Sequence, residues 1–318
     1  MGSLSHIFRM HETVAMELTL WPSVSQSWTD LLDAVRSVEG LGWHGVMIED
    51  HFMADGRGFG AESDPRFEVT SVLSALAVAT SSLRLTPLVL SATYRHPAVV
   101  ANWAATVDRI SGGRLTLGLG AGWQENEHAQ YGIELPPPAQ RLRRLDEYCT
   151  IVRSLLDESS TSFQGAHFQL NDAWCEPKPV QTRLPLLIGG KGDQMMKLVA
   201  RHADEWNMWA MPERFTERST VLDRACETIG RDPASIRRST QALVYLTDSS
   251  EEAQRFMNAA GGRAAFAGNP AQFAELVALW RDVGVDRVIV PDWNLGAGVR
   301  RAESLEAITR SVDELGNE

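Results

Sequence analysis

The chain has 318 residues, of which 44% are hydrophobic and 22% are charged, a balance typical of a globular protein and a length that suits a single α/β barrel. Its formal net charge of −11 argues against nucleic acid or an anionic membrane as the main partner. Three widely spaced cysteines predict neither a disulfide framework nor a zinc site, and without a signal peptide or a membrane-spanning stretch we expect a cytoplasmic protein.

Eight strand-like runs alternate with helical segments along the chain. The predicted strands cover residues 14–21, 45–49, 83–90, 114–120, 185–188, 205–209, 240–246 and 286–290. The predicted helices cover residues 28–40, 66–80, 97–110, 139–157, 192–202, 212–229, 271–283 and 302–315. A polar, proline-bearing segment at residues 159–183 resembles an insertion. Alternation also permits a doubly wound sheet, but the count of eight favours one (β/α)8 barrel domain over residues 1–318.

The stretch GLGAGWQENE, residues 118–127, carries three glycines and admits two interpretations. A dinucleotide-binding turn follows the first strand of its domain and runs directly into a helix. This stretch follows the fourth predicted strand, and the continuation WQENEHAQYGIELPPP ends in prolines that cannot extend a helix. We therefore interpret the glycines as the end of a barrel strand, where the backbone approaches a ligand at the active-site mouth.

In a barrel, the residues just after each strand face the active-site mouth. Asp50 and His51 follow the second strand, and the imidazole suits a proton donor or an anion-stabilising group, or else it bonds locally with Asp50 as its partner. No second histidine lies at ligand spacing, so we predict no metal site. Ser91 and Ala92 end the third strand, where small residues permit a bulge against a ring or form an ordinary loop.

The turn GGKGD, residues 189–193, runs directly into a predicted helix. A glycine turn at a helix N-terminus offers free N–H groups to a phosphate, and Lys191 adds a positive charge. Asp193 also suits a cap of the same helix, and a plain tight turn explains the glycines without a ligand. Tryptophans at or just past three strand ends either wall a flat apolar pocket or belong to the core: Trp21, Trp123 and Trp209.

Four stretches of the sequence resemble the bacterial-luciferase-like superfamily of flavin and deazaflavin enzymes. They are GWHGVMIEDHF, TYRHPAVVANWAATVDRISGGRLTLGLGAGWQENEHAQYGI, FQGAHFQLNDAWCEPKPVQ and LPLLIGGKGDQMMKLVARHADEWN. The similarity spans residues 14–246 and is greatest to a subgroup described as probable oxidoreductases dependent on coenzyme F420, an 8-hydroxy-5-deazaflavin. The resemblance implies a (β/α)8 TIM barrel with a flat cofactor ring at its C-terminal mouth.

The resemblance also implies which residues form the site. His51, beside Asp50, is implied to lie near the ring as donor or acid, and a bulge, sometimes with a non-prolyl cis peptide, is implied at residues 87–91. The residues implied to contact the ring are His51, Leu90 and Ser91, then Gly120, Ala121, Gly122, Trp123 and Asn126. The cofactor phosphate is implied to bind at Gly190, Lys191, Gly192 and Asp193.

Some positions depart from the superfamily's patterns. Trp123 stands where its deazaflavin-dependent sugar-phosphate dehydrogenases have a catalytic glutamate, and Asp55 stands where they have a tryptophan. Sugar-phosphate oxidation is therefore not expected. Glu125 and Glu127 lie nearby, but their spacing does not show whether either points inward. Members of the subgroup usually carry a run of glycines where this chain has GKGD, so the phosphate contact is expected in altered form.

We expect a deazaflavin-dependent oxidoreductase that transfers hydride between C5 of F420 and a small organic substrate: an alkene, imine, carbonyl or alcohol. His51 is then the proton donor or acceptor. Two alternatives stay open: a monooxygenase that uses reduced FMN and dioxygen with a separate flavin reductase, and a non-catalytic flavin-binding protein. The resemblance also implies a homodimer, for which residues 98–110 supply an apolar face unless that face packs on the barrel: Val99, Val100, Trp103 and Val107.

Overall fold

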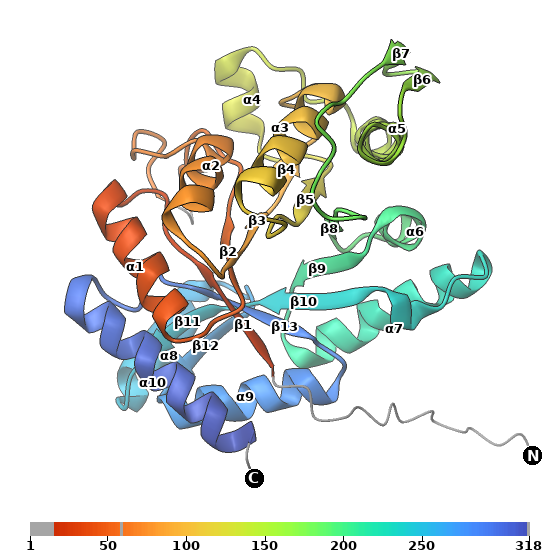
Figure 1. Cartoon of the computed structure of the whole chain (residues 1–318). Coiled ribbons are helices and arrows are strands. Elements are labelled where there is room, and N and C mark those ends of the chain that lie inside the picture. Colours follow the sequence, from red (N-terminus) through yellow and green to blue (C-terminus); the bar gives the residue numbers. More distant parts are fainter. Residues whose placement is uncertain (1–15, 58–59, 317–318) are drawn as a thin grey trace, which may run out of the picture.

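The computed structural model describes residues 16–57 and 60–316, which form an α/β barrel (Figure 1). The first predicted strand begins at residues 14–15, which lie outside the described residues. The strands of the barrel are β1 (Glu17–Trp21), β2 (Gly45–Ile48), β3 (Arg84–Pro87), β4 (Leu90–Ser91), β5 (Leu117–Gly120), β8 (Leu186–Gly189), β9 (Glu205–Trp209), β10 (Arg237–Gln241) and β13 (Arg287–Pro291). Every neighbouring pair among them is parallel.

The sheet closes on itself. β13 pairs with β1 along its whole length, from Arg287 opposite Glu17 to Pro291 opposite Trp21. On the other side, a parallel bridge between Leu85 and Leu115 joins β3 to the segment that leads into β5. β3 and β4 together therefore occupy one position of the barrel, and the predicted eight-fold (β/α) alternation is confirmed.

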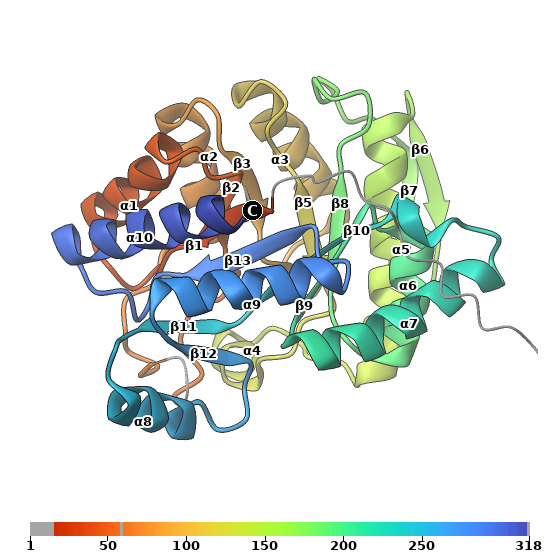
Figure 2. The same ribbon diagram turned by 90° about the horizontal axis from the view of Figure 1, so that it is seen from below.

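Helices surround the barrel (Figure 2). They are α1 (Trp28–Gly40), α2 (Val69–Ala79), α3 (Pro97–Ile110), α4 (Glu125–Tyr131), α5 (Pro138–Asp157), α6 (Asp193–His202), α7 (Pro212–Thr228), α8 (Ser250–Ala260), α9 (Pro270–Asp282) and α10 (Gly298–Gly316), with a 3-10 turn, η1 (Pro233–Ser235), before β10. α5 shows why the periodicity predicted helices correctly. Its Leu145, Cys149, Val152 and Leu156 recur every three or four residues and are all buried against the barrel.

Two predicted strands are divided in the structure. The third is interrupted at Leu88 and Val89, whose connecting peptide bond is cis, as the resemblance implied for this region. The seventh runs from Arg237 to Gln241 in the barrel, and the chain then leaves the barrel as β11 (Leu243–Leu246). β11 pairs in parallel with β12 (Ala265–Gly268) in a separate two-stranded sheet that packs against α8. Both corrections have one cause: local apolar pattern does not reveal which neighbour a strand pairs with.

Three segments predicted as loops contain regular structure. The segment after Gly122 forms the helix α4, which ends at Gly132 in the left-handed conformation (φ 67°), before the prolines are reached. Residues 247–270 contain α8 and β12. The insertion-like segment 159–183 forms an antiparallel hairpin of β6 (Thr161–Gln164) and β7 (Gln169–Ala173), whose turn donates three backbone N–H groups to the Glu147 carboxylate.

The apolar residues of α3 serve two surfaces. Val100 and Val107 are buried against the barrel, whereas Val99 is 61% exposed and Ile110 is 50% exposed. Trp103 lies between these groups and donates its indole N–H to Ser74 of α2 at 3.2 Å. The exposed edge leaves the homodimer as a prediction. In the two described stretches of the chain, no helix combines the length and the apolar character needed to cross a membrane.

Candidate active site

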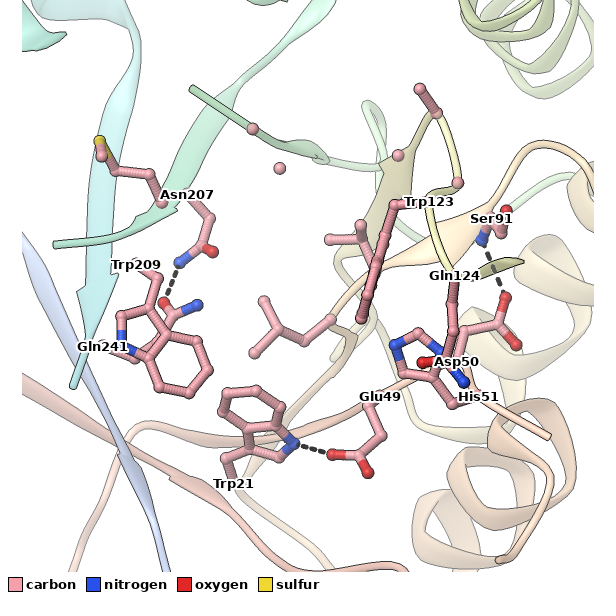
Figure 3. A pocket seen from close by; sticks show the side chains of 18 of the residues that line it. Trp21, Glu49, Asp50, His51, Ser91, Trp123, Gln124, Asn207, Trp209 and Gln241 are labelled. Atoms are coloured by element: carbon pink, nitrogen blue, oxygen red, sulfur yellow. Dashed lines mark hydrogen bonds between the residues drawn. The ribbon is translucent and has the colours of Figure 1, made fainter. Parts of the chain in front are cut away.

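A cavity of about 550 Å³ opens at the carboxyl ends of the barrel strands (Figure 3). One side, which we call the glycine wall, follows β4, β5 and β8 and consists of Ser91, Gly120, Ala121, Gly122, Gly189 and Gly190. The other side, the tryptophan wall, follows β1, β9, β10 and β13 and consists of Trp21, Asn207, Trp209, Gln241 and Trp293. β2 lies between the two walls and is followed directly by Glu49, Asp50 and His51.

The glycines of the glycine wall make room for the interrupted third strand. A Cβ atom on Gly120 would lie 2.6 Å from Cγ2 of Val89, and one on Gly122 would lie 2.5 Å from Oγ of Ser91. A Cβ atom on Gly118 would collide with the carbonyl oxygen of Pro87. The sequence pattern explains these glycines by the approach of a ligand. The structure gives a prior reason, which is contact with the chain itself, while the other face of Gly120 and Gly122 lines the cavity.

His51 is held by a carboxylate that sequence spacing left unresolved. Nδ1 of His51 lies 2.7 Å from Oε1 of Glu127, and the backbone N–H of Phe52 donates to Oε2 of the same carboxylate at 2.7 Å. Glu127 comes from α4 and is fully buried, whereas Glu125 is exposed. Burial opposes ionisation, but hydrogen bonds from His51, Tyr94 and Phe52 outweigh it and hold the pKa of Glu127 below its usual value.

This pairing fixes the tautomer of His51. An ionised carboxylate can only accept, so Nδ1 carries the proton and Nε2 is the ring nitrogen available to a ligand. Across residues 16–57 and 60–316 Nε2 has no protein hydrogen-bond partner, and the ring lines the cavity with 23% of its side chain exposed. The Trp123 ring packs edge-on against it at a centroid distance of 5.4 Å. The arrangement suits transfer of one proton between Nε2 and a bound molecule.

Asp50 has a different partner from the one considered in the sequence. Its carboxylate accepts from the Ser91 backbone at 2.8 Å and from both terminal nitrogens of Arg95 at 2.7 and 3.0 Å, and the local pairing with His51 is not formed. Arg95 also binds Glu68, the N-cap of α2, at 2.6 Å. Although burial disfavours its charge, these carboxylates raise the pKa of Arg95. Asp50 thus ties the end of β2 to the end of β4.

Three indole rings form the apolar part of the tryptophan wall. Trp21 packs edge-on against Trp209 at 5.5 Å and against Trp293 at 4.6 Å between ring centroids. The indole N–H of Trp21 donates to Glu49 at 2.6 Å, and Glu49 also forms a buried ion pair with Arg66. The prediction that Trp21, Trp123 and Trp209 wall a pocket is confirmed, with Trp123 beside His51 and the other two opposite it.

Asn207 and Gln241 are polar residues of the cavity that sequence reasoning missed. Both are buried, at 3% and 5% exposure. The side-chain amide of Asn207 donates to Oε1 of Gln241 at 2.9 Å and to the Ser239 hydroxyl at 3.1 Å. A signal was present in the sequence: Asn207 is the polar residue among the apolar neighbours of WNMW, and Gln241 follows small residues at the carboxyl end of its strand.

The remaining predicted site residues lie at different distances from the cavity. Gly190 and Lys191 line it. Gly192 is the N-cap residue of α6 and has no side chain to cap it. The predicted cap by Asp193 is not formed, and its carboxylate binds Arg218 at 2.7 Å. The other two predicted contacts do not line the cavity: Leu90 is buried in the core, and Asn126 donates to the Ala54 carbonyl at 2.8 Å.

Comparison with known proteins identifies the family. The family model described as luciferase-like monooxygenase matches residues 9–285, so the chain belongs to the luciferase-like monooxygenase family of enzymes. The chain is 32% identical over 209 residues to the pyrimidine monooxygenase RutA of Cronobacter sakazakii, covering 63% of this chain and 60% of that protein. It is 30% identical over 230 residues to RutA of Stutzerimonas stutzeri, covering 70% of this chain and 61% of that protein. The match thus spans about three fifths of these relatives.

Solved structures of two enzyme classes share the fold. An F420-dependent secondary alcohol dehydrogenase, in complex with an F420–acetone adduct, superposes with a TM-score of 0.80 and 18% identity, covering 93% of this chain and 99% of that one. The long-chain alkane monooxygenase LadA superposes with a TM-score of 0.79 and 13% identity, covering 95% of this chain and 92% of that one. At such identities the likeness establishes the barrel fold.

Proposed function

We propose that this protein is an F420-dependent oxidoreductase in which His51 gives a proton to, or takes one from, a small organic substrate. The observation that carries the proposal is the pair formed by His51 and the buried Glu127. In this pair the second ring nitrogen of His51 is left to face the cavity. A reduced alkene, imine or carbonyl needs one proton as well as a hydride, and an oxidised alcohol must lose one. A positioned imidazole can donate or accept this proton near neutral pH.

The residues present fit a flat ring with a phosphate-bearing chain. The glycine wall offers a surface of backbone, and Leu88 and Val89 offer an apolar face beside it. Lys191, together with the start of α6, which has no side-chain cap, offers a positive charge and free N–H groups for the phosphate. The bound cofactor would supply or accept the hydride. The three indoles of the tryptophan wall exclude water, which strengthens hydrogen bonds made inside the cavity.

A second candidate is a monooxygenase that uses reduced FMN and dioxygen, with a separate reductase to supply the cofactor. The observation that favours it is the similarity to pyrimidine monooxygenases, at 30–32% identity. The same cavity serves this reaction, since FMN also combines a flat ring with a phosphate-bearing chain. A non-catalytic flavin-binding protein is the remaining alternative, and the His51–Glu127 pair argues against it because binding alone does not require an aligned proton donor.

The test is a fluorescence titration of the purified protein with F420 and with FMN, each oxidised and reduced. Tighter binding of F420 supports the proposal, and turnover of unsaturated or carbonyl compounds without dioxygen should follow. Tighter binding of reduced FMN, with dioxygen consumption in the presence of a flavin reductase, would replace it with the monooxygenase. If neither cofactor binds, both assignments fail.

A further inference from the structure

The amides of Asn207 and Gln241 form a short chain that ends in the cavity. Asn207 Nδ2 donates two hydrogen bonds, one to Gln241 Oε1 and one to the Ser239 hydroxyl. The two remaining polar atoms, Asn207 Oδ1 and Gln241 Nε2, are turned toward the cavity (Figure 3). Within residues 16–57 and 60–316 neither of these atoms has a protein hydrogen-bond partner.

Such a chain always presents one acceptor and one donor. Amide oxygen and nitrogen are assigned from the surrounding hydrogen bonds, so both side chains can be rotated by half a turn. Rotating both would make Gln241 the donor to Asn207, and the cavity would then meet the Asn207 nitrogen and the Gln241 oxygen. One donor and one acceptor remain in either case. A ligand that satisfies both needs an acceptor beside a donor of its own.

We propose that this amide pair binds the cis-amide edge of a planar heterocyclic substrate, that is, a lactam or imide whose C=O and N–H lie side by side. The proposal rests on the proposed function, because it names the substrate class of the same cavity. The ring C=O would accept from one amide and the ring N–H would donate to the other. Trp21 and Trp209 adjoin the pair and give an apolar surface for the heterocycle.

The position of the pair assigns it to substrate. Asn207 and Gln241 come from β9 and β10, in the tryptophan wall, whereas the surface proposed for the cofactor comes from β4, β5 and β8. His51 stands beyond the end of β2, so a heterocycle held by the amides lies between them and the proton donor. Because both amides are buried, a molecule that lacks the N–H or the C=O leaves a polar group unpaired and is rejected.

Calorimetric titration of the wild-type protein with three cis-amides, uracil, 2-pyridone and glutarimide, tests the proposal. Each is compared with its fully N-methylated form, which has no ring N–H: 1,3-dimethyluracil, N-methyl-2-pyridone and N-methylglutarimide. We expect at least one parent compound to bind about tenfold or more tightly than its methylated form. Equal binding within every pair, or no binding of any parent compound, would overturn the proposal.

Two variants separate the substrate from the cofactor. Gln241→Glu replaces the donor with an acceptor, so the affinity for the bound cis-amide should fall by about tenfold or more. Ser239→Ala removes a partner of Asn207 without changing the edge in the cavity, and it should keep that affinity. F420 and FMN affinities, measured on the same proteins, should stay at the wild-type value. If Gln241→Glu weakens cofactor binding as much as cis-amide binding, the pair serves the cofactor and the proposal is wrong.

The result that would refute the proposed function differs from the result that would refute the substrate class. A wild-type protein that binds neither F420 nor FMN refutes the cofactor assignment whatever the cis-amides do. A protein that binds a cofactor but does not discriminate any cis-amide from its methylated form refutes only the substrate class. Thermal unfolding of both variants shows that an altered affinity is not a loss of fold.

Discussion

The two walls of the cavity are built from opposite kinds of residue. The glycine wall is mostly a surface of backbone, because the side chains of Val89, Ser91 and Met195 stand close to where Cβ atoms of its glycines would lie. The tryptophan wall is a surface of side chains held by hydrogen bonds, as in Trp21 with Glu49 and Asn207 with Gln241. The first wall is therefore fixed by how the barrel packs, whereas single side chains of the second can be replaced independently. We therefore expect cofactor binding to depend on the first wall and substrate choice on the second.

The largest effect should come from His51→Ala, at the junction between the walls. Without the imidazole, turnover should fall by about 10²–10⁴-fold, because the proton donor is lost. Affinities for cofactor and substrate should change little, since each wall remains. Single-turnover kinetics and fluorescence titration measure the two quantities. His96→Ala, which changes an exposed histidine at the start of α3, is the matched control. Near-normal turnover of His51→Ala would favour the non-catalytic alternative.

Glu127→Gln tests whether the buried carboxylate positions His51 through a charged hydrogen bond. The amide can still accept one hydrogen bond but carries no charge. Loss of a charged hydrogen bond corresponds to about 1.5–3 kcal/mol, roughly 10- to 160-fold in rate. The lowered pKa of Glu127 means that the wild-type carboxylate stays ionised as pH falls below the usual carboxyl range, until its own lowered value is reached. The stabilisation by the ionised carboxylate is therefore full above that range and lost only at lower pH.

The pH profile distinguishes this role from a structural one. In Glu127→Gln no carboxylate titrates at this position, so the fall in turnover that protonation of Glu127 causes at low pH should disappear while KM stays constant. Glu127→Asp keeps the charge and should restore part of the rate. An unchanged pH profile of turnover, together with a lower free energy of unfolding, would show that Glu127 only supports the fold.

The sequence predicted the glycine wall better than the tryptophan wall. Glycine turns and the DHF stretch are local patterns, so the sequence alone predicts Gly120 and Gly190, and likewise His51 between the walls. Asn207 and Gln241 stand 34 residues apart, and only the pairing of β9 with β10 brings them together. The inward position of Glu127 depends on α4, which the sequence predicts as a loop because prolines follow it; the helix ends at Gly132 before they are reached.

Gly120→Ala should destabilise the protein by about 1–3 kcal/mol, since the added methyl group would lie 2.6 Å from the Val89 side chain. Cofactor affinity should fall with stability, because the contact lies behind the glycine wall. Gly40→Ala adds a methyl group where no atom lies within 4 Å and is the control. Chemical denaturation measures both. If the contact with Val89 is the cause, the double variant Gly120→Ala with Val89→Ala should recover stability; no recovery would mean that a different contact sets the wall.

Trp21→Phe should give the smallest loss of stability and should separate substrate binding from cofactor binding. Phenylalanine keeps an aromatic ring against Trp209 and Trp293 but loses the indole N–H that binds Glu49. Because Glu49 keeps its ion pair with Arg66, unfolding free energy should fall by only about 1 kcal/mol. Trp28→Phe, which alters an edge-on contact with Phe67 outside the cavity, is the matched control. Substrate KM should rise in Trp21→Phe alone, with cofactor affinity unchanged in both variants. A loss of cofactor affinity in Trp21→Phe would mean that the cofactor contacts both walls. The assignment of cofactor binding to the glycine wall and substrate choice to the tryptophan wall would then be wrong.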